Sequence, residues 1–227
     1  DRRLRLGIAG GEWKKMMADA TARTRFASEV KKIIEQYEFD GVDFDFEWPA
    51  NASEYNNYSA TVIQMRSTLG KYVYFTASLH PVSFKISPEA IDALDFISYQ
   101  CYGPAVMRFP YEQFVKDGEA AVAYGIPKNK LVMGVPFYGS TGSLIAAYCD
   151  FVNDGLATTN EDTYTYKGNT YTFNSIETIR KKARYVCEED YAGIMSWDLA
   201  TDIDITNNKS LLKVIKEEFE YYANPTE

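Results

Sequence analysis

Strand-like and helix-like segments alternate along the whole chain, and this alternation limits the fold more than any other feature. Each strand-like run is followed, directly or after an insertion, by a stretch whose apolar residues recur at helical spacing. The runs lie at residues 4–10, 40–47, 72–79, 94–103, 130–139 and 191–200. Strands that alternate with helices form parallel sheets with helices outside. The sequence therefore predicts a β/α barrel or a doubly wound sheet, with six strands.

The helices are predicted from their apolar stripes and from one start signal, Ser87 followed by Pro88. They are expected at residues 26–37, 58–69, 87 onward, 114–122, 176–186 and 211–219. The alternating segment 163–173 predicts a β-hairpin with its turn at Gly168 and Asn169. Its tyrosines are expected either to form an aromatic rim for sugars or to cover the barrel. Because 46% of the 227 residues are hydrophobic, the chain can bury a substantial core, and residues 1–227 are predicted to form one domain.

Composition and charge argue against several classes of partner. The net charge is −8 and no dense block of Lys or Arg occurs, which disfavours nucleic acid and anionic membranes. No apolar run approaches the roughly 20 residues that a membrane span needs. Cys101, Cys149 and Cys187 have no zinc-binding spacing and are predicted to be small buried apolar residues. We therefore predict no metal, no cofactor, and a neutral or cationic ligand.

The stretch DGVDFDFEWP, residues 40–49, places several acids inside an aromatic strand. Successive side chains of a strand point to opposite faces, so Asp43, Asp45 and Glu47 share one face. The other face is apolar. Burial of an isolated charge costs many kcal/mol unless the charge is paired or neutralised. The presence of three carboxylates along this strand therefore requires an explanation. An edge strand in water and a metal site are two structural explanations.

The remaining explanation is catalytic. Carboxylates at alternate positions of a strand lie roughly 6 to 7 Å apart, which is close enough for each to raise the other's pKa. One of them would then stay protonated near neutral pH, as a general acid that breaks a glycosidic bond must.

The four acids in order match the DxxDxDxE signature of the family 18 glycoside hydrolases, the chitinases and endo-β-N-acetylglucosaminidases, and the chain resembles this family. LGIAGG is similar to the family's SxGG strand, MGVPFYG to its GxPxYG strand, and AGIMSWDL to its last strand. The resemblance implies a TIM-type (β/α)8 barrel that lacks its first two βα units in this chain, because the SxGG-like strand begins at Leu4. A missing N-terminal segment or a partner would complete such a barrel. The edge of the strand at 4–10 is then expected to be unpaired, or paired outside the family order.

The resemblance also implies roles for the acids. Glu47 would protonate the leaving oxygen. Asp45 would orient the substrate's own N-acetyl group, which attacks the anomeric carbon, and would stabilise the oxazolinium ion that results. Asp43 would share a proton with Asp45, and Asp40 would only shape the entry to the strand.

Other residues are expected around the sugar. Where many chitinases carry Met-x-Tyr-Asp, this chain has Gln100-Cys101-Tyr102-Gly103, which resembles plant-type chitinases and several glycan-cleaving members. Tyr102 would donate a hydrogen bond to the acetyl group. The expected substrate-binding residues are Gln100, Trp197, Tyr138 and Gly10. His80, the single histidine, is predicted to be a solvated loop residue.

These features predict a glycosidase that cleaves β-1,4-linked N-acetylglucosamine glycans, chitin or chitooligosaccharides first, by a substrate-assisted retaining route. An endo-β-N-acetylglucosaminidase acting on N-linked glycans is the alternative, favoured by Gln100 and by the lack of a large α+β insertion before the last strand. The aromatic rim and Trp48-Pro49 favour chitin. A third alternative is a lectin-like member that binds glycans without cleaving them, although such members typically replace the final glutamate. The protein is expected to be secreted, extracellular or periplasmic, and three N-x-S/T sequons at Asn51, Asn57 and Asn208 are compatible with that.

Overall fold

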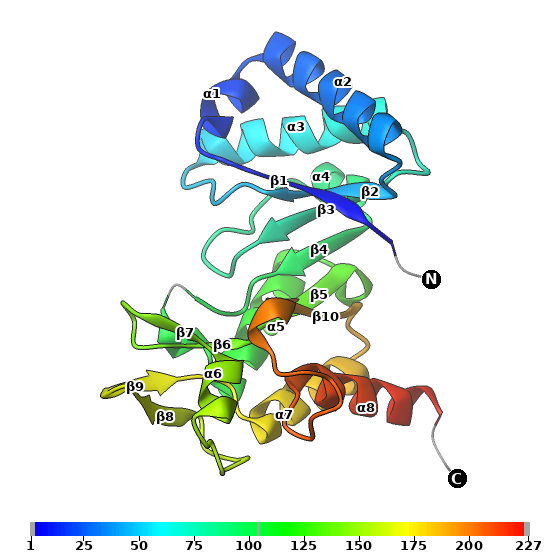
Figure 1. Cartoon of the computed structure of the whole chain (residues 1–227). Helices are drawn as coiled ribbons and strands as arrows, with labels where there is room; N and C mark the ends of the chain where they lie inside the picture. Colours follow the sequence, from blue (N-terminus) through cyan, green and yellow to red (C-terminus); the bar gives the residue numbers. More distant parts are fainter. Residues whose placement is uncertain (1–2, 104, 225–227) are drawn as a thin grey trace. The chain divides into compact units, whose positions relative to one another are not determined.

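The structure is a computed structural model that describes residues 3–103 and 105–224 (Figure 1). The chain divides into two compact units. The first runs through Tyr99 and includes Ala121–Lys130, and the second comprises Gln100–Ala120 and the chain from Leu131 onward.

The first unit is built on four parallel strands, in the order β1 (Arg5–Ala9), β2 (Gly41–Asp45), β3 (Tyr74–Leu79) and β4 (Phe96–Tyr99). The helices that connect them are α1 (Trp13–Ala18), α2 (Ala20–Tyr37), α3 (Ala52–Leu69) and α4 (Pro88–Ala93). The predicted α/β alternation is confirmed, whereas α1 was not predicted. In the described part of the chain β1 lies at the end of the strand order and pairs only with β2, so the predicted unpaired edge is confirmed too.

The helix starts follow local sequence chemistry. The side chains of Asp19, Asn51 and Ser87 accept hydrogen bonds from backbone N–H groups in the first turns of α2, α3 and α4. Pro88 occupies the first turn of α4, as predicted. The apolar face of β2 is packed against its neighbours, since Phe44 lies 5.8 Å from Phe26 of α2 and 5.0 Å from Phe75 of β3.

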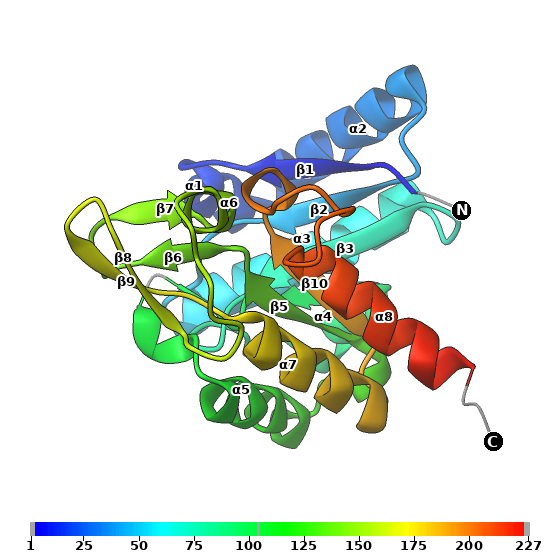
Figure 2. The same ribbon diagram turned by 60° about the horizontal axis from the view of Figure 1, so that its bottom comes forward.

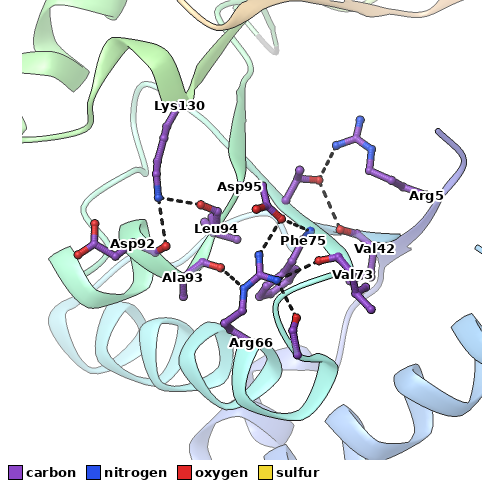
Figure 3. Close-up of polar contacts among 12 residues, drawn as sticks. Arg5, Val42, Arg66, Val73, Phe75, Asp92, Ala93, Leu94, Asp95 and Lys130 are labelled. Carbon is purple, nitrogen blue, oxygen red and sulfur yellow. Dashed lines mark hydrogen bonds and ion pairs between the residues drawn. The ribbon is translucent and has the colours of Figure 1, made fainter. Parts of the chain in front are cut away.

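Arg66 ties the end of α3 to the segments that lead into β3 and β4 (Figure 3). Its guanidinium donates to the carbonyl oxygens of Ala93, Gly70 and Val73 at 2.7, 3.0 and 2.9 Å. It also donates to the Asp95 carboxylate at 2.7 Å. The planar fork of arginine satisfies several backbone acceptors at once, which fixes the N-terminal ends of these strands.

Lys130 fixes the end of the neighbouring helix α4 (Figure 3). Its ammonium donates to the carbonyl oxygens of Ile91, Asp92 and Leu94 at 2.9, 3.1 and 2.8 Å. These are the carbonyl groups that a helix end leaves without intrahelical partners.

The second unit contains two parallel strands, β5 (Leu131–Pro136) and β10 (Gly193–Trp197). A separate antiparallel sheet has the order β7 (Ile145–Ala147), β6 (Tyr138–Ser140), β9 (Asn169–Thr172) and β8 (Thr163–Tyr166), with α6 (Tyr148–Asn153) following β7 (Figure 2). The remaining helices are α5 (Tyr111–Tyr124), whose last turn belongs to the first unit, α7 (Ile176–Glu188) and α8 (Leu211–Ala223). Single 3₁₀ turns occupy Val106–Arg108, Lys128–Lys130 and Leu199–Thr201.

The hairpin of β8 and β9 exists where predicted, but its turn is one residue earlier. Tyr166 pairs with Asn169, so Lys167 and Gly168 form the turn, with φ of 48° and 77°. Positive φ at both central residues is the type I′ pattern that matches strand twist. The predicted turn at Gly168 and Asn169 was therefore wrong, because Asn169 already belongs to β9.

Candidate active site

The acids of β2 lie as the strand alternation predicts. Val42 and Phe44 are fully buried, whereas Asp43 and Asp45 are partly exposed on the opposite face. Glu47 follows two residues after the end of β2 and is exposed. The carboxylate most important to the catalytic hypothesis is thus reachable from solvent.

Asp43 is held by groups from both neighbouring strands. The Thr76 hydroxyl donates to its Oδ1 and the Ser78 hydroxyl donates to its Oδ2 at 2.9 Å. Arg5 of β1 lies 3.8 Å from Oδ1 and donates to the Thr76 Oγ1 at 2.6 Å. Donors on both oxygens suit an ionised carboxyl, which only accepts hydrogen bonds. Sharing of a proton between Asp43 and Asp45 stays a prediction.

The loop after β2 is fixed by the turn that follows β3. The Trp48 ring packs on the His80 ring with centroids 4.7 Å apart. Ser83 donates to the carbonyl oxygen of Pro49 at 2.6 Å, and Tyr55 donates to the Ser83 hydroxyl at 3.1 Å. These contacts hold the backbone on which Glu47 lies.

The prediction that His80 is solvated was wrong. Its side chain is buried at 2% exposure, and its Nδ1 accepts a hydrogen bond from the Val82 backbone N–H at 3.2 Å.

Tyr58 of α3 lies close enough to Asp43 and Asp45 for their negative charges to act on its hydroxyl. Burial, together with the charges of Asp43 and Asp45, raises the pKa of this phenol. Within the described ranges its buried hydroxyl has no hydrogen-bond partner. A neutral phenol therefore lies next to the carboxylates.

Four side chains of the second unit form an aromatic wall, which we define as Tyr102, Tyr138, Phe109 and Met195. The Tyr138 ring meets the rings of Tyr102 and Phe109 edge-on, at 6.4 and 5.6 Å. The Tyr102 hydroxyl lies 3.4 Å from the Met195 sulfur. Burial raises the pKa of Tyr138 to about 12. Tyr138 therefore keeps its hydroxyl proton at neutral pH and can donate a hydrogen bond.

The structure explains why glycine follows Tyr102. Gly103 has a φ of +28°, and a Cβ atom added to it would lie 2.8 Å from the Tyr138 hydroxyl. A side chain at position 103 would therefore displace Tyr138. Gln100, the other expected pocket residue of this segment, is buried at 6% exposure.

Trp197 ends β10 with 55% of its surface exposed. Its backbone is fixed, because its carbonyl oxygen accepts a hydrogen bond from the Phe137 N–H at 2.8 Å. An exposed tryptophan on a fixed backbone presents a flat apolar surface on which a sugar ring can stack. The peptide bonds Glu47–Trp48 and Trp197–Asp198 are both cis.

Two residues of the first unit have conformational roles. Gly10 has a φ of +146°, a conformation that favours glycine, and nothing lies within 4 Å of its missing Cβ. Asp40 accepts a hydrogen bond from the Leu4 N–H at 2.7 Å, and this contact fixes the start of β1 against β2. The expectation that Asp40 shapes the strand entry is confirmed.

Several predictions concern other side chains. Cys101, Cys149 and Cys187 are free thiols, of which only Cys101 is buried. Tyr164, Tyr166 and Tyr171 of the hairpin surround Phe151, at 5.6, 5.7 and 5.5 Å. These tyrosines pack on α6 beside the small sheet, whereas they were expected to form a rim for sugars or to cover the barrel.

Residues 3–103 and 105–224 contain no group of three His, Cys, Asp or Glu side chains that could hold a metal ion. No helix within these residues is long and apolar enough to cross a membrane. The three acids belong to the first unit, and Tyr102, Tyr138 and Trp197 belong to the second. A common site made of both groups therefore stays a prediction.

Comparison with known proteins identifies one family. Residues 3–202 match the family described as glycosyl hydrolases family 18. Probable chitinase 2 of Drosophila melanogaster is 23% identical over an alignment that includes 96% of this chain and 60% of the relative. The chain thus spans less than two thirds of that relative's length.

Solved structures agree in fold. A chitinase from Bacteroides thetaiotaomicron superposes with a TM-score of 0.82 at 24% identity, covering 95% of this chain and 76% of that one. A chitinase-like agglutinin from Robinia pseudoacacia gives a TM-score of 0.76 at 18% identity, covering 95% and 81%. The chain therefore has the α/β fold of TIM type that its sequence predicts.

Proposed function

The chain belongs to family 18 of the glycosyl hydrolases, and on this basis we propose that it is a glycosidase that cleaves β-1,4-linked N-acetylglucosamine glycans. The observation that carries the proposal is the pair of acids on one face of β2, Asp43 and Asp45, followed two residues after the strand by the exposed Glu47. Carboxylates on a strand of a parallel sheet are costly, and acid catalysis gives them a purpose.

In the proposed reaction Glu47 protonates the glycosidic oxygen while the carbonyl oxygen of the substrate's N-acetyl group attacks the anomeric carbon. The bond to the leaving sugar breaks and a cyclic oxazolinium ion forms. Asp45 accepts a hydrogen bond from the acetamido N–H and stabilises the positive charge. Glu47, now a carboxylate, takes a proton from water, which opens the ring with net retention. This substrate-assisted route is an exception to the scheme that uses two carboxylates.

The second unit carries groups of its own that suit a sugar. In our proposal Tyr102 donates a hydrogen bond to an acetyl oxygen, Trp197 offers a surface on which a sugar ring stacks, and Tyr138 and Gln100 are further sugar-binding residues of this unit. The protonated hydroxyl of Tyr138 and the exposure of Trp197 support these roles. We propose Gly10 of the first unit as a further substrate-binding residue, since nothing lies within 4 Å of its missing Cβ.

Two other functions remain candidates. Gln100 in place of methionine favours an endo-β-N-acetylglucosaminidase that acts on N-linked glycans. The likeness to an agglutinin favours a lectin that binds glycans without cleaving them. Glu47 favours the enzyme over the lectin, since binding alone does not need a proton donor.

We also propose that the protein acts outside the cytoplasm, where chitin and glycoprotein glycans are found. Of the three sequon asparagines, Asn51 and Asn208 are exposed in the structure. Asn51 caps α3 through its side chain, whereas the Asn208 side chain accepts a hydrogen bond from the Lys213 ammonium at an exposed position, so we take Asn208 as the better acceptor for a glycan. Release of glycan from purified protein by a glycosidase, lost in Asn208→Gln, would support secretion.

The test of the reaction replaces Glu47 by Gln, which removes the transferable proton and nearly keeps the shape. Hydrolysis of chitooligosaccharides should fall by about 10²–10⁴-fold, the usual contribution of general acid catalysis, while glycan binding persists. Glu35→Gln, at an exposed position on α2, makes the same chemical change away from the site and should leave the rate unchanged.

The substrate panel separates the three functions. Release of sugar from chitooligosaccharides indicates a chitinase, and release of N-glycans from a glycoprotein indicates the endoglycosidase. Binding of glycans without turnover in the parent protein indicates the lectin. Comparable turnover of cellulose and chitin oligomers contradicts the mechanism, because cellulose lacks the N-acetyl group.

A further inference from the structure

Lys182 of α7 is a charged residue that the proposed reaction does not use, and its side chain is fully buried. Its Nζ donates hydrogen bonds at 2.7 Å to the carbonyl oxygen of Phe109 and at 2.7 Å to the Asn174 side chain. The ammonium also lies 4.9 Å from the centre of the Phe114 ring. Burial of a lysine ammonium costs considerable desolvation energy, so the presence of Lys182 at this position requires an explanation.

The charged groups around Lys182 are already engaged with other partners. Asp117 pairs with Arg108 at 2.8 Å, and Asp162 accepts hydrogen bonds from the Ser175 N–H and the Thr178 hydroxyl, both at 2.8 Å. The other titratable groups that act on Lys182 are Cys101 and Glu112. Burial outweighs the attraction of these neighbours and lowers the pKa of Lys182 to about 7.

The carbonyl group that Lys182 holds belongs to a member of the aromatic wall. Phe109 is 1% exposed, and its carbonyl oxygen also accepts a hydrogen bond from Asn174 Nδ2 at 2.8 Å. Its ring packs edge-on against Tyr138, which in turn packs against Tyr102. A displacement of the Phe109 backbone would therefore move the tyrosine that is expected to bind the acetyl group.

We propose that Lys182 is a positioning residue whose ammonium fixes Phe109 and, through the rings of the aromatic wall, sets the place of Tyr138 and Tyr102. Charge-assisted hydrogen bonds are roughly twice as strong as neutral ones. Deprotonation leaves two N–H donors on Lys182, so both bonds persist but weaken, and the wall relaxes. The catalytic consequence rests on the proposed function, whereas the structural contact does not.

The test follows the Met195 methyl group by NMR in protein labelled with ¹³C at the methionine methyl carbons. Met195 is a sensitive reporter because its sulfur lies 3.4 Å from the Tyr102 hydroxyl. Met195→Leu assigns its signal among the six methionines of the chain. In the parent protein the signal should shift between about pH 5.5 and 8.5, with a midpoint near the pKa of Lys182.

Three variants show whether Lys182 causes the shift. Lys182→Met lacks both donors and Lys182→Arg keeps its charge throughout the range, so neither should give a shift with a midpoint near neutrality. Lys181→Met, at the adjacent exposed position, should titrate like the parent. If Lys182→Met fails to fold, Lys182→Arg still decides the point. A Met195 signal that does not move in the parent, or moves equally in a Lys182 variant, overturns the proposal.

Kinetics separate this proposal from the proposed function. If Tyr102 acts mainly in the transition state, kcat of Lys182→Met on chitotetraose should fall about tenfold with little change in KM. If the parent is inactive but its Met195 signal titrates as described, the proposed function is contradicted and the positioning of the aromatic wall by Lys182 is supported. If the parent is active but its Met195 signal does not change with pH, only the positioning role of Lys182 is contradicted.

Discussion

At the scale of single residues, Gly103 shows how a local conformation limits side-chain choice. Its backbone is left-handed and its missing Cβ would lie 2.8 Å from the Tyr138 hydroxyl. We expect Gly103→Ala to lower the free energy of unfolding by about 1–2 kcal/mol through backbone strain alone, and further through displacement of Tyr138. Urea denaturation measures the loss.

Gly142→Ala is the matched control for this change. Gly142 also has a positive φ, of +96°, but nothing lies within 4 Å of its missing Cβ. The control therefore carries backbone strain without a clash. Equal losses in the two variants would show that Tyr138 moves away at no cost.

Residue patterns predicted the acidic face of β2 because alternation along one strand needs no knowledge of the neighbouring strands. Thr76 and Ser78 also alternate along their own strand, but the sequence does not say which strand they face. The strand register places Asp43 opposite Gly7 on one side and Thr76 on the other. This register brings the side chains of Thr76, Ser78 and Arg5 to Asp43. His80 was misjudged for the same reason, since its cover comes from Trp48, which lies distant in sequence.

At the scale of elements, Arg66 connects α3 to the entries of β3 and β4 through acceptors on several segments. Replacement by Lys keeps the charge but puts every donor on one nitrogen, which cannot reach Ala93, Val73 and Asp95 together. We expect Arg66→Lys to lower the free energy of unfolding by about 2–3 kcal/mol, since part-buried acceptors lose their partners. Thermal or urea unfolding measures this loss.

Arg25 of α2 provides the control for Arg66, because it is an exposed arginine on the neighbouring helix. Arg25→Lys should change the stability by less than about 0.5 kcal/mol, as surface substitutions usually do. If Arg66→Lys lowers the stability equally little, the hydrogen bonds of Arg66 drawn in Figure 3 contribute little to the stability of the first unit.

Among the elements, the sequence predicted best those with a long periodic pattern. The helices α2, α3 and α7 lie where their apolar stripes indicated, because burial of one face dictates the period. The small sheet was predicted only as one hairpin, since its strands β6 and β7 have three residues each. The turn at Lys167 and Gly168 was misplaced by one residue because the register depends on packing outside the hairpin, such as the contact of Tyr171 with Phe151.

At the scale of the whole molecule, the alternation of strands and helices predicted the α/β class, because parallel strands need helical crossovers. The division into two compact units follows no break in composition, since α5 continues across it. The sequence had no linker that could have indicated it. That all 227 residues act as one catalytic domain therefore stays a prediction.

Lys182 should also make the stability of the protein depend on pH. Burial lowers its pKa to about 7 in the folded state, against 10.5 for an ordinary lysine. Between these values the unfolded chain binds one more proton than the folded chain, so the free energy of unfolding rises with pH. This contribution rises by up to about 1.4 kcal/mol per pH unit. It is flat below pH 7, where both states are charged, and flat again above the ordinary lysine pKa.

The difference between the parent and Lys182→Met isolates this contribution, because the other titrating groups are common to both proteins. Urea denaturation at a series of pH values should show the parent gaining stability relative to the variant as pH rises from about 7 to 9. Lys181→Met should instead follow the parent over the whole range, since its exposed side chain keeps an ordinary environment in both states. A constant difference between the parent and Lys182→Met would mean that Lys182 stays charged when buried, held by its bonds to Phe109 and Asn174.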